Sequence, residues 1–490
     1  MEIFWFDKSK TLHLFNFEKL NYLKSIFNMA ASLFEDFQPH SKEVWKNQAI
    51  KDLKGKDFDQ TLIWQAEGDL HIEPYYNHED LSSIPVDLIQ SAQKNTAMAA
   101  WHNREKIILS SEKATNQHIL EAIEWGADSV IIDFEGKDIT TIDFKKLLHQ
   151  IKLSEIYVFF KVQNQSVQLL ETLASLIPYQ MKGGVQDDYL ATWMSAGELS
   201  KDSTIQLAQS IRKVQNHPHF KALLVSGEVF HNAGANSVQE IAFTLSNALE
   251  YIDQLTEAGL SLEEILNKIE FSIAVGTDYF TEIAKIRAIR YLWQKVLSEG
   301  YGFEKASEFP AVISAHTSTY FDAALTPNTN MLRATTEAMS AIIGGANALV
   351  LHAYNSTFEN EESFGKRIAR NISTILKEES YLDKVNDPSA GSYYIEHLTF
   401  ELAQKALNLL QEVASLGGSI AAFEQGFIQN TIAQNHNNRQ EATTSGKRVM
   451  VGVNKFRFDE KPFVYEATET PSSTIPLLKA QRLSEVVEAL

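Results

Sequence analysis

The sequence contains no cysteine among its 490 residues. This absence excludes a disulfide-bonded scaffold, a cysteine-ligated zinc site, an iron–sulfur cluster and a cysteine nucleophile. Basic residues are also in deficit, with 44 Lys and Arg against 63 Asp and Glu, which gives a formal net charge of −19. Nucleic acids and anionic membrane surfaces attract basic patches, so we expect neither to be a partner.

Long hydrophobic runs are missing as well. No stretch of about 18 consecutive apolar residues is present, which argues against a transmembrane helix. Residues 1–28 mix aromatic and charged side chains, lack the apolar core and cleavage site of a signal peptide, and contain no Arg. We therefore predict a cytoplasmic protein. We interpret residues 1–28 either as an upstream extension or as an aromatic arm that packs on a partner.

Several catalytic motifs do not occur. The sequence has no G-x-x-x-x-G-K-[ST] phosphate loop, no G-x-S-x-G nucleophile turn and no H-E-x-x-H metal motif. His217 and His219 form an H-x-H pair, but Pro218 between them indicates a surface turn, and no further ligand cluster lies nearby. We therefore expect no metal site.

From about residue 97, short β-rich apolar runs alternate with helical segments. Such runs, apolar rather than strictly alternating, are typical of parallel strands covered by helices. Eight strands alternating with helices over about 260 residues predict an α/β fold, a (β/α)₈ TIM barrel. The expected strands cover residues 97–102, 129–134, 156–162, 184–188, 222–229, 270–276, 311–317 and 348–354.

Shorter patterns complete the expected secondary structure. Helical spacing appears at 44–55, 364–380, 396–418 and 477–490, and strand-like runs appear at 61–65, 69–76 and 447–458. The polar run 435–447 predicts an exposed loop, and Ser237 and Ser261 each begin a capping-box pattern.

These patterns divide the chain into five parts. We expect an N-terminal extension or arm, an N-terminal segment, the barrel, a mostly helical C-terminal addition, and a tail or truncated linker. The corresponding residues are 1–28, 29–96, 97–365, 366–468 and 469–490.

Polar residues follow several of the expected barrel strands. Active sites of such barrels lie where strands end and loops begin. The candidate residues at this mouth are Ser226, His231, His316 and His352. Isolated histidines in such places more often satisfy structural hydrogen bonds than perform chemistry, so both roles stay open.

Four segments between residues 220 and 456 carry a specific pattern in order. The first runs from Ser226 to Ala235, and the second, AVGTDYF with EIAKIR, runs from Ala274 to Arg287. The other two are Thr317–Gly345, which contains NMLRATTE, and Arg367–Glu396, which is followed by Val451–Lys455. In these segments the chain resembles the methylmalonyl-CoA mutase family.

This resemblance implies a barrel that threads an acyl-CoA along its axis, together with a C-terminal cobalamin domain. It also implies an isomerase that uses adenosylcobalamin to interconvert (R)-methylmalonyl-CoA and succinyl-CoA through a radical. The cofactor supplies the difficult chemistry in such enzymes, and the barrel binds and orients the substrate.

The departures from the family pattern concern the active site. Catalytic subunits read S-G-Y-H after the fifth strand, and that His hydrogen-bonds the migrating thioester carbonyl. Here Glu228 and Val229 occupy the Tyr and His positions. Valine can neither donate nor accept a hydrogen bond, and a carboxylate would repel an anionic substrate. We therefore expect degenerate positions here and no catalytic residue.

Other family motifs are also altered. The stretch 95–103 lacks the R-Q-Y-A-G-F pattern, and Thr204 to Gln206 retain at most part of a T-x-Q-N-D motif. Asp69 and His71 begin a D-x-H-x-x-G cobalamin motif, but Pro74 replaces its Gly, so we place His71 on a short peripheral strand. About 30 residues follow Phe458, against about 100–150 for a cobalamin domain, so we expect that domain to be absent.

The combined pattern is similar to the small (β) subunit of heterodimeric methylmalonyl-CoA mutases. It implies a non-catalytic chain that stabilises a large catalytic subunit in a heterodimer. Adenosylcobalamin is expected on the large subunit and not on this chain. Two alternatives stay open. One is an acyl-CoA-binding barrel subunit of a split mutase that uses a separate cobalamin-binding protein. The other is a module that binds an acyl-CoA to regulate its partner.

Overall fold

The computed structural model describes residues 40–94, 100–197, 199–358, 363–458 and 475–488. The interpretations of residues 1–28 lie outside this range. The chain divides into two compact units, Met1–Ile63 and Trp64–Leu490. In the first, the described elements are helices α2 (Lys42–Asp52) and α3 (Phe58–Leu62), begun by the caps Ser41 and Asp57. The expected helix at 44–55 is thus confirmed as α2.

The second unit begins with a small antiparallel hairpin. Strand β1 (Trp64–Ala66) pairs with β2 (Leu70–Ile72) around Gly68, whose φ of +73° suits glycine. The strand expected at 69–76 is confirmed in shorter form as β2. The strand expected at 61–65 begins only at Trp64, because Thr61 and Leu62 end helix α3.

A parallel sheet forms the centre of this unit. Its order is β7-β6-β5-β4-β3-β11-β10-β9-β8, with every neighbouring pair parallel. The strands are β3 (His102–Ile108), β4 (Ser129–Asp133), β5 (Tyr157–Lys161), β6 (Gly183–Gln186), β7 (Phe220–Lys221), β8 (Leu223–Ser226), β9 (Ile269–Val275), β10 (Ile313–Thr317) and β11 (Ala348–Val350).

The two ends of this sheet belong to one stretch of chain. Only Ala222 separates β7, which pairs with β6, from β8, which pairs with β9. The nine strands therefore occupy eight positions around a barrel, which confirms the predicted (β/α)₈ fold.

Helices cover the outside of this barrel. The described helices of the unit are α4 (Val86–Lys94), α5 (Glu112–Glu124), α6 (Phe144–Leu147), α7 (Ser166–Leu176), α8 (Tyr189–Ala196), α9 (Ser203–Lys213), α10 (Glu228–Asn232), α11 (Ser237–Glu257), α12 (Leu262–Leu266), α13 (Tyr279–Lys295), α14 (Pro327–Ile343), α15 (Ser363–Glu378), α16 (Tyr393–Ser415), α17 (Ser419–Glu424), α18 (Phe427–Thr444) and α19 (Glu485–Glu488). Short 3-10 turns lie at His78–Leu81, Ile139–Thr141 and Ala306–Glu308, and a π-helical turn lies at Val296–Gly300.

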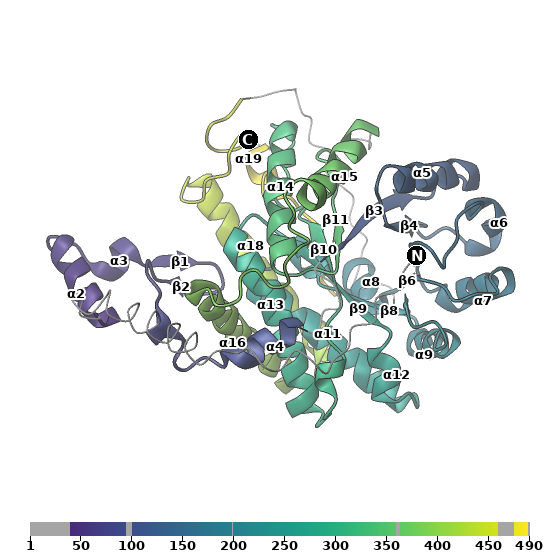
Figure 1. Cartoon of the computed structure of the whole chain (residues 1–490), viewed down its shortest axis with the longest axis horizontal. Coiled ribbons are helices and arrows are strands. Elements are labelled where there is room, and N and C mark those ends of the chain that lie inside the picture. The colour runs from purple at the N-terminus through teal and green to yellow at the C-terminus, as the bar shows by residue number, and fades with distance from the viewer. Residues whose placement is uncertain (1–39, 95–99, 198, 359–362, 459–474, 489–490) are drawn as a thin grey trace, which may run out of the picture. The chain divides into compact units, whose positions relative to one another are not determined.

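Eight of these helices form the outer ring. Each of α5, α6, α7, α9, α11, α13, α14 and α15 contacts the next, and Figure 1 shows α5, α6, α7 and α9 along the outside of the first barrel strands. Helix α16 packs across α11 and α13. The expected helices at 364–380 and 396–418 are confirmed as α15 and α16. The division placed at residue 365 falls inside α15, and the five-part division stays a prediction.

Burial explains why the strands are apolar. Every residue of β4 and of β9 is buried, because one face meets the helices and the other meets the barrel interior. A large cluster of buried apolar side chains fills the layer between strands and helices. None of the described helices combines the length and the apolar character needed to cross a membrane.

Three sequence expectations about strands and caps need correction. Strand β3 begins at His102 rather than 97, and residues 97–99 lie outside the described range. Its inward side chains include Arg104 and Lys106, so it lacked the apolar run that marked the others. The fifth strand ends at Ser226, and Glu228 begins α10. The capping box expected at Ser237 lies one residue earlier, at Asn236 with Gln239, whereas that at Ser261 is confirmed.

Three expectations near the C-terminus also change. Residues 447–458 form turns with a single bridge between Val451 and Lys455 instead of a strand. Asn454 donates to the carbonyl of Arg448 within these turns and to the carbonyl of Thr443 at the end of α18. The run 435–447 is no exposed loop, because α18 continues to Thr444. Within 477–490, α19 covers only Glu485–Glu488 of the described residues.

Candidate functional site

The candidate residues lie at the carboxyl end of the barrel strands. Ser226 ends β8, and His231 lies in the short helix α10 that follows. His316 lies in β10, and His352 follows β11 by two residues. The strand order thus brings all four to one end of the barrel, but the structure gives them different surroundings.

His231 belongs to a buried polar network. Its Nε2 lies 2.7 Å from Ser318 Oγ, and its Nδ1 lies 3.4 Å from Glu240 Oε2. Lys285 Nζ donates to Glu240 Oε2 at 2.7 Å and to the carbonyl of Ala274 at 2.7 Å. Burial by itself raises the pKa of Glu240, but the Lys285 ammonium and His231 hold it below its ordinary value. Both ring nitrogens of His231 therefore have structural partners.

Ser226 contributes its backbone to a second buried group. Its N–H donates to Asp188 Oδ2 at 2.7 Å, and the Tyr251 hydroxyl donates to Asp188 Oδ1 at 2.6 Å. Burial raises the pKa of Asp188 to about 6. Asp188 also caps α8, so this carboxyl joins the fourth and fifth strand ends. The only sequence signal of that role is an acidic pair, Asp187 and Asp188, at the end of the expected fourth strand.

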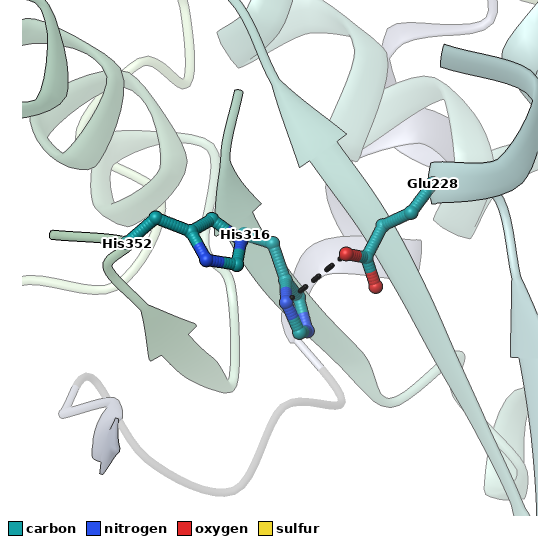
Figure 2. A group of neighbouring side chains, drawn as sticks. All are labelled: Glu228, His316 and His352. Atoms are coloured by element: carbon teal, nitrogen blue, oxygen red, sulfur yellow. Dashed lines mark ion pairs between the residues drawn. The ribbon is translucent and has the colours of Figure 1, made fainter. Parts of the chain in front are cut away.

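Glu228, His316 and His352 converge at the barrel mouth. Glu228 Oε2 lies 3.2 Å from His316 Nδ1, and one ligand atom from each of the three residues lies within 4.8 Å of the others. Figure 2 shows His316 between His352 and Glu228 in this view. Three residues that the sequence named separately thus form one group.

Both histidines of this group are neutral near pH 7. Burial, followed by the charges of Arg104 and Lys106, holds the pKa of His316 well below its ordinary value. Burial, with His316 and Lys106 beside it, lowers the pKa of His352 to about 3. The group therefore offers one carboxylate and two unprotonated imidazoles.

Val229, next to Glu228 in the chain, packs against apolar side chains. Its side chain is partly buried and packs against the main hydrophobic cluster. Its side chain has no hydrogen-bond donor, so it cannot polarise a carbonyl group.

Side chains fill the barrel interior below the mouth. Arg104 forms a buried ion pair with Glu270, and its guanidinium carbon lies 3.7 Å from the centroid of the Phe159 ring. Phe159 packs with Ile131 and Val350 in a separate inner cluster. A hollow of about 250 Å³ opens at the amino ends of the strands, and its lining includes Arg104, Phe159 and Glu270. The middle of the barrel axis is thus occupied by protein.

His217 and His71 lie away from this site. The Nδ1 of His217 accepts a hydrogen bond from the Met181 N–H at 3.0 Å, so it supports the turn before β7. His71 lies on β2, as expected, with its Nε2 3.5 Å from Asp69 Oδ1.

Lys106 and Lys161 share a carboxylate at the mouth. Each Nζ lies 3.0 Å from Asp133 Oδ2, and the Asp133 side chain is 9% exposed. Burial raises the pKa of Asp133, but Lys161 and Lys106 outweigh it and lower the pKa from 3.8 to about 2. A carboxyl with a depressed folded-state pKa stabilises the fold above pH 3.8 and loses that contribution as pH falls toward 2.

We expect this loss to be measurable by urea unfolding. The shift corresponds to about 2 kcal/mol, and screening of the half-exposed lysines reduces it to about 1–2 kcal/mol. Asp133→Asn should be less stable than the wild type at pH 7, and the difference should shrink as pH falls through the interval from 3.8 to about 2. The control is Asp202→Asn, at an exposed residue whose side chain does not cap its helix. A constant difference between wild type and Asp133→Asn across that interval would contradict the assignment.

Comparisons with known proteins place these features in context. A family model described as methylmalonyl-CoA mutase matches residues 132–489. The methylmalonyl-CoA mutase small subunit of Porphyromonas gingivalis is 30% identical over 442 residues, covering 86% of this chain and 71% of that protein. The small subunit of Streptomyces virginiae is 28% identical, covering 93% and 77%. The methylmalonyl-CoA mutase of Cereibacter sphaeroides is 30% identical, covering 85% of this chain and 64% of that protein. This chain thus spans less than two thirds of the Cereibacter protein.

Among solved structures, the dihydropteroate synthase of Yersinia pestis is similar over 57% of this chain and 93% of that one. The TM-score is 0.31 and the sequence identity is 12%. An overlap of this size adds nothing to the barrel assignment, which rests on the strand order.

Proposed function

This chain belongs to the methylmalonyl-CoA mutase family, a family of isomerases, and we propose that it is the non-catalytic small subunit of a heterodimeric mutase. Its partner is a large subunit that interconverts (R)-methylmalonyl-CoA and succinyl-CoA. Two relatives named as small subunits support this role. The chain's contribution is then to stabilise the large subunit through a shared interface.

The observation that carries the proposal is the pair Glu228 and Val229. The family resemblance implies Tyr and His at these positions of a catalytic subunit, where the His polarises the thioester carbonyl. Here Val229 packs against the hydrophobic core, and Glu228 faces His316 and Ser272. A chain without the polarising donor lacks an interaction that general acid catalysis needs.

The filled barrel axis supports the same conclusion. The family resemblance implies an acyl-CoA threaded along this axis. Arg104, Glu270 and Phe159 are all almost fully buried there, and the ion pair is tied to Ser129 and Ser314. An acyl-CoA chain would have to displace a buried ion pair, which costs about 3–5 kcal/mol when one partner is left unpaired.

The described residues also offer a poor fit to adenosylcobalamin. A cobalamin-binding His needs a loop that opens beneath the corrin, yet His71 lies on the β1–β2 hairpin beside Asp69. We therefore assign the cofactor to the large subunit.

Co-expression with a candidate large subunit tests the proposal. We expect a stable 1:1 complex in size-exclusion chromatography, and an interface of about 2,000 Å² or more, as obligate partners have. The purified chain alone, supplied with adenosylcobalamin and methylmalonyl-CoA, should show no turnover. Turnover by the chain alone would overturn the proposal.

Matched substitutions locate the active site within that complex. Val229→Ala in this chain should leave turnover unchanged. Replacing the His of the S-G-Y-H motif in the large subunit should lower it at least about 100-fold. The alternative, an acyl-CoA-binding subunit, predicts binding of CoA esters to the isolated chain. Calorimetric titration with succinyl-CoA should give no binding heat, and a defined binding isotherm would favour that alternative.

A further inference from the structure

The barrel mouth combines residues that ligate metals elsewhere in proteins. Glu228 comes from the start of α10, His316 from β10 and His352 from the residues after β11. Helix α10, strand β10 and the segment after β11 thus present one carboxylate and two imidazoles, whose ligand atoms lie within 4.8 Å of one another. A Zn²⁺ ion takes nitrogen and oxygen ligands at about 2.0–2.2 Å, which puts neighbouring ligand atoms about 3–3.5 Å apart. The Glu228–His316 separation of 3.2 Å already falls in this interval.

Neighbouring hydroxyl groups orient two of the three side chains. The Ser272 hydroxyl donates to Glu228 Oε1, which leaves Oε2 directed at His316. The Nε2 of His316 lies 3.3 Å from Ser314 Oγ, so Nδ1 is the nitrogen that faces the centre of the group. Such outer partners fix the tautomer and the orientation of metal-binding histidines.

His352 completes the group. Its backbone N–H donates to Thr317 Oγ1 at 3.0 Å, which anchors the residue at the end of β10. Its ring stacks at an angle near His316, with centroids 6.1 Å apart. In the described part of the chain no side chain or backbone group hydrogen-bonds this ring, so its ring nitrogens stay available.

The site can be reached from solvent. Glu228 and His352 are partly exposed, whereas His316 is buried beneath them. Lys106 and Lys161 line the same mouth, and they share the single carboxylate Asp133. The formal charges of Lys106 and Lys161 are balanced by those of Asp133 and Glu228, so a bound divalent ion would bring the net positive charge of the mouth.

We propose that Glu228, His316 and His352 bind one divalent transition-metal ion of the zinc class at the barrel mouth. Two His and one carboxylate suit Zn²⁺, Co²⁺ or Fe²⁺ rather than Mg²⁺ or Ca²⁺, which prefer oxygen ligands. Three protein ligands leave at least one position open to water or an anion. This proposal differs from the sequence expectation of no metal ligands. That expectation considered residues close together in the sequence, whereas these three residues lie far apart in the chain and meet only in the folded barrel. It does not depend on the proposed small-subunit role.

Metal titration of the full chain, free of any histidine tag and stripped with chelator, tests the proposal. Calorimetry with Zn²⁺ should show one ion per chain, and Co²⁺ should give visible d–d absorption with the same stoichiometry. Glu228→Gln, His316→Asn and His352→Asn should each weaken Zn²⁺ binding by about 100-fold or more. Ser272→Ala should weaken it about tenfold, because it removes an outer partner of Glu228.

The other histidine pair supplies the matched control. His219→Ala, in the exposed H-x-H turn, should leave both the stoichiometry and the affinity unchanged. Circular dichroism of each variant checks that it is folded, and Glu228→Gln keeps the side-chain volume. Two outcomes would overturn the proposal: no binding of Zn²⁺ or Co²⁺ at millimolar concentration, or binding that survives all three ligand substitutions.

Discussion

Replacing Lys285 by alanine is expected to lower the free energy of unfolding by about 3–5 kcal/mol, because it leaves two buried carboxylates without their cation. The Lys285 side chain is fully buried, and its Nζ lies 2.7 Å from Glu240 Oε2 and 2.5 Å from Glu282 Oε2. It also donates to the Ala274 carbonyl at the end of β9. Burial opposes its charge, but Glu240 and Glu282 raise the pKa of Lys285 above its ordinary value. The ammonium therefore stays charged and holds β9, α11 and α13 together.

The mechanism can be separated from simple loss of packing. Lys285→Met restores most of the side-chain volume but not the charge, so it should remain strongly destabilised. Adding Glu240→Gln to Lys285→Met should recover part of the loss, because removing both charges is less costly than removing one. Lys305→Ala removes an exposed partner of Glu263 and should cost at most about 1 kcal/mol. Urea unfolding of all four variants measures the differences, and equal losses for Lys285→Ala and Lys305→Ala would refute the mechanism.

The barrel was predictable where packing alone decides the residue type. Strands β4 and β9 are buried on both faces. Their sequences, SVIID and IEFSIAV, are therefore mostly apolar, and this apolar character allowed both to be predicted as strands. Strand β3 carries charged residues into the barrel interior, and Arg104 is neutralised there by Glu270, a residue 166 positions later in the chain. The pattern within one strand cannot reveal a counter-ion on another strand. The first barrel strand was therefore predicted at 97–102, whereas β3 is His102–Ile108.

The same reason explains the misjudged polar run at 435–447. Its residues look like a solvated loop, yet Arg439 is buried in α18 and pairs with Glu67 beside the β1–β2 hairpin. His436 in the same helix lies with its Nδ1 2.8 Å from the Tyr320 hydroxyl. Polar residues enter the interior when distant partners satisfy them, and sequence periodicity does not report such partners.

The candidate site was predictable by position but not by grouping. The barrel prediction placed Ser226, His231, His316 and His352 at strand ends, and the structure places them there. It could not show that His231 is held by Ser318 and Glu240, because those contacts depend on side-chain direction. Nor could it show that Glu228 turns toward His316, since the strand before it ends earlier than expected and α10 sets the direction.

Gly183→Ala is expected to destabilise the barrel by about 4 kcal/mol or more, a loss typical of severe backbone and packing faults. Gly183 begins β6 and pairs with Val158 of β5 on one side and Phe220 of β7 on the other. Its φ is +114°, a conformation that residues with a side chain rarely adopt. A Cβ at this position would lie 2.0 Å from the Val158 carbonyl oxygen and 2.6 Å from the Val158 nitrogen. The strand cannot yield locally, because both of its neighbours belong to the closed barrel.

Gly302→Ala is the matched control that separates this clash from backbone preference. Gly302 also has a positive φ, +63°, but an added Cβ there meets no atom within 4 Å. Its substitution should therefore cost only the conformational term of about 1–2 kcal/mol. Amide hydrogen exchange adds a local measure: Gly183→Ala should expose the amides of β5 and β6, whereas Gly302→Ala should leave them protected. If both variants lost the same stability, the contact with Val158 would not be the source of the constraint. A larger loss for Gly183→Ala, with deprotection confined first to β5 and β6, is expected if the added Cβ clashes with the Val158 backbone of the paired strand.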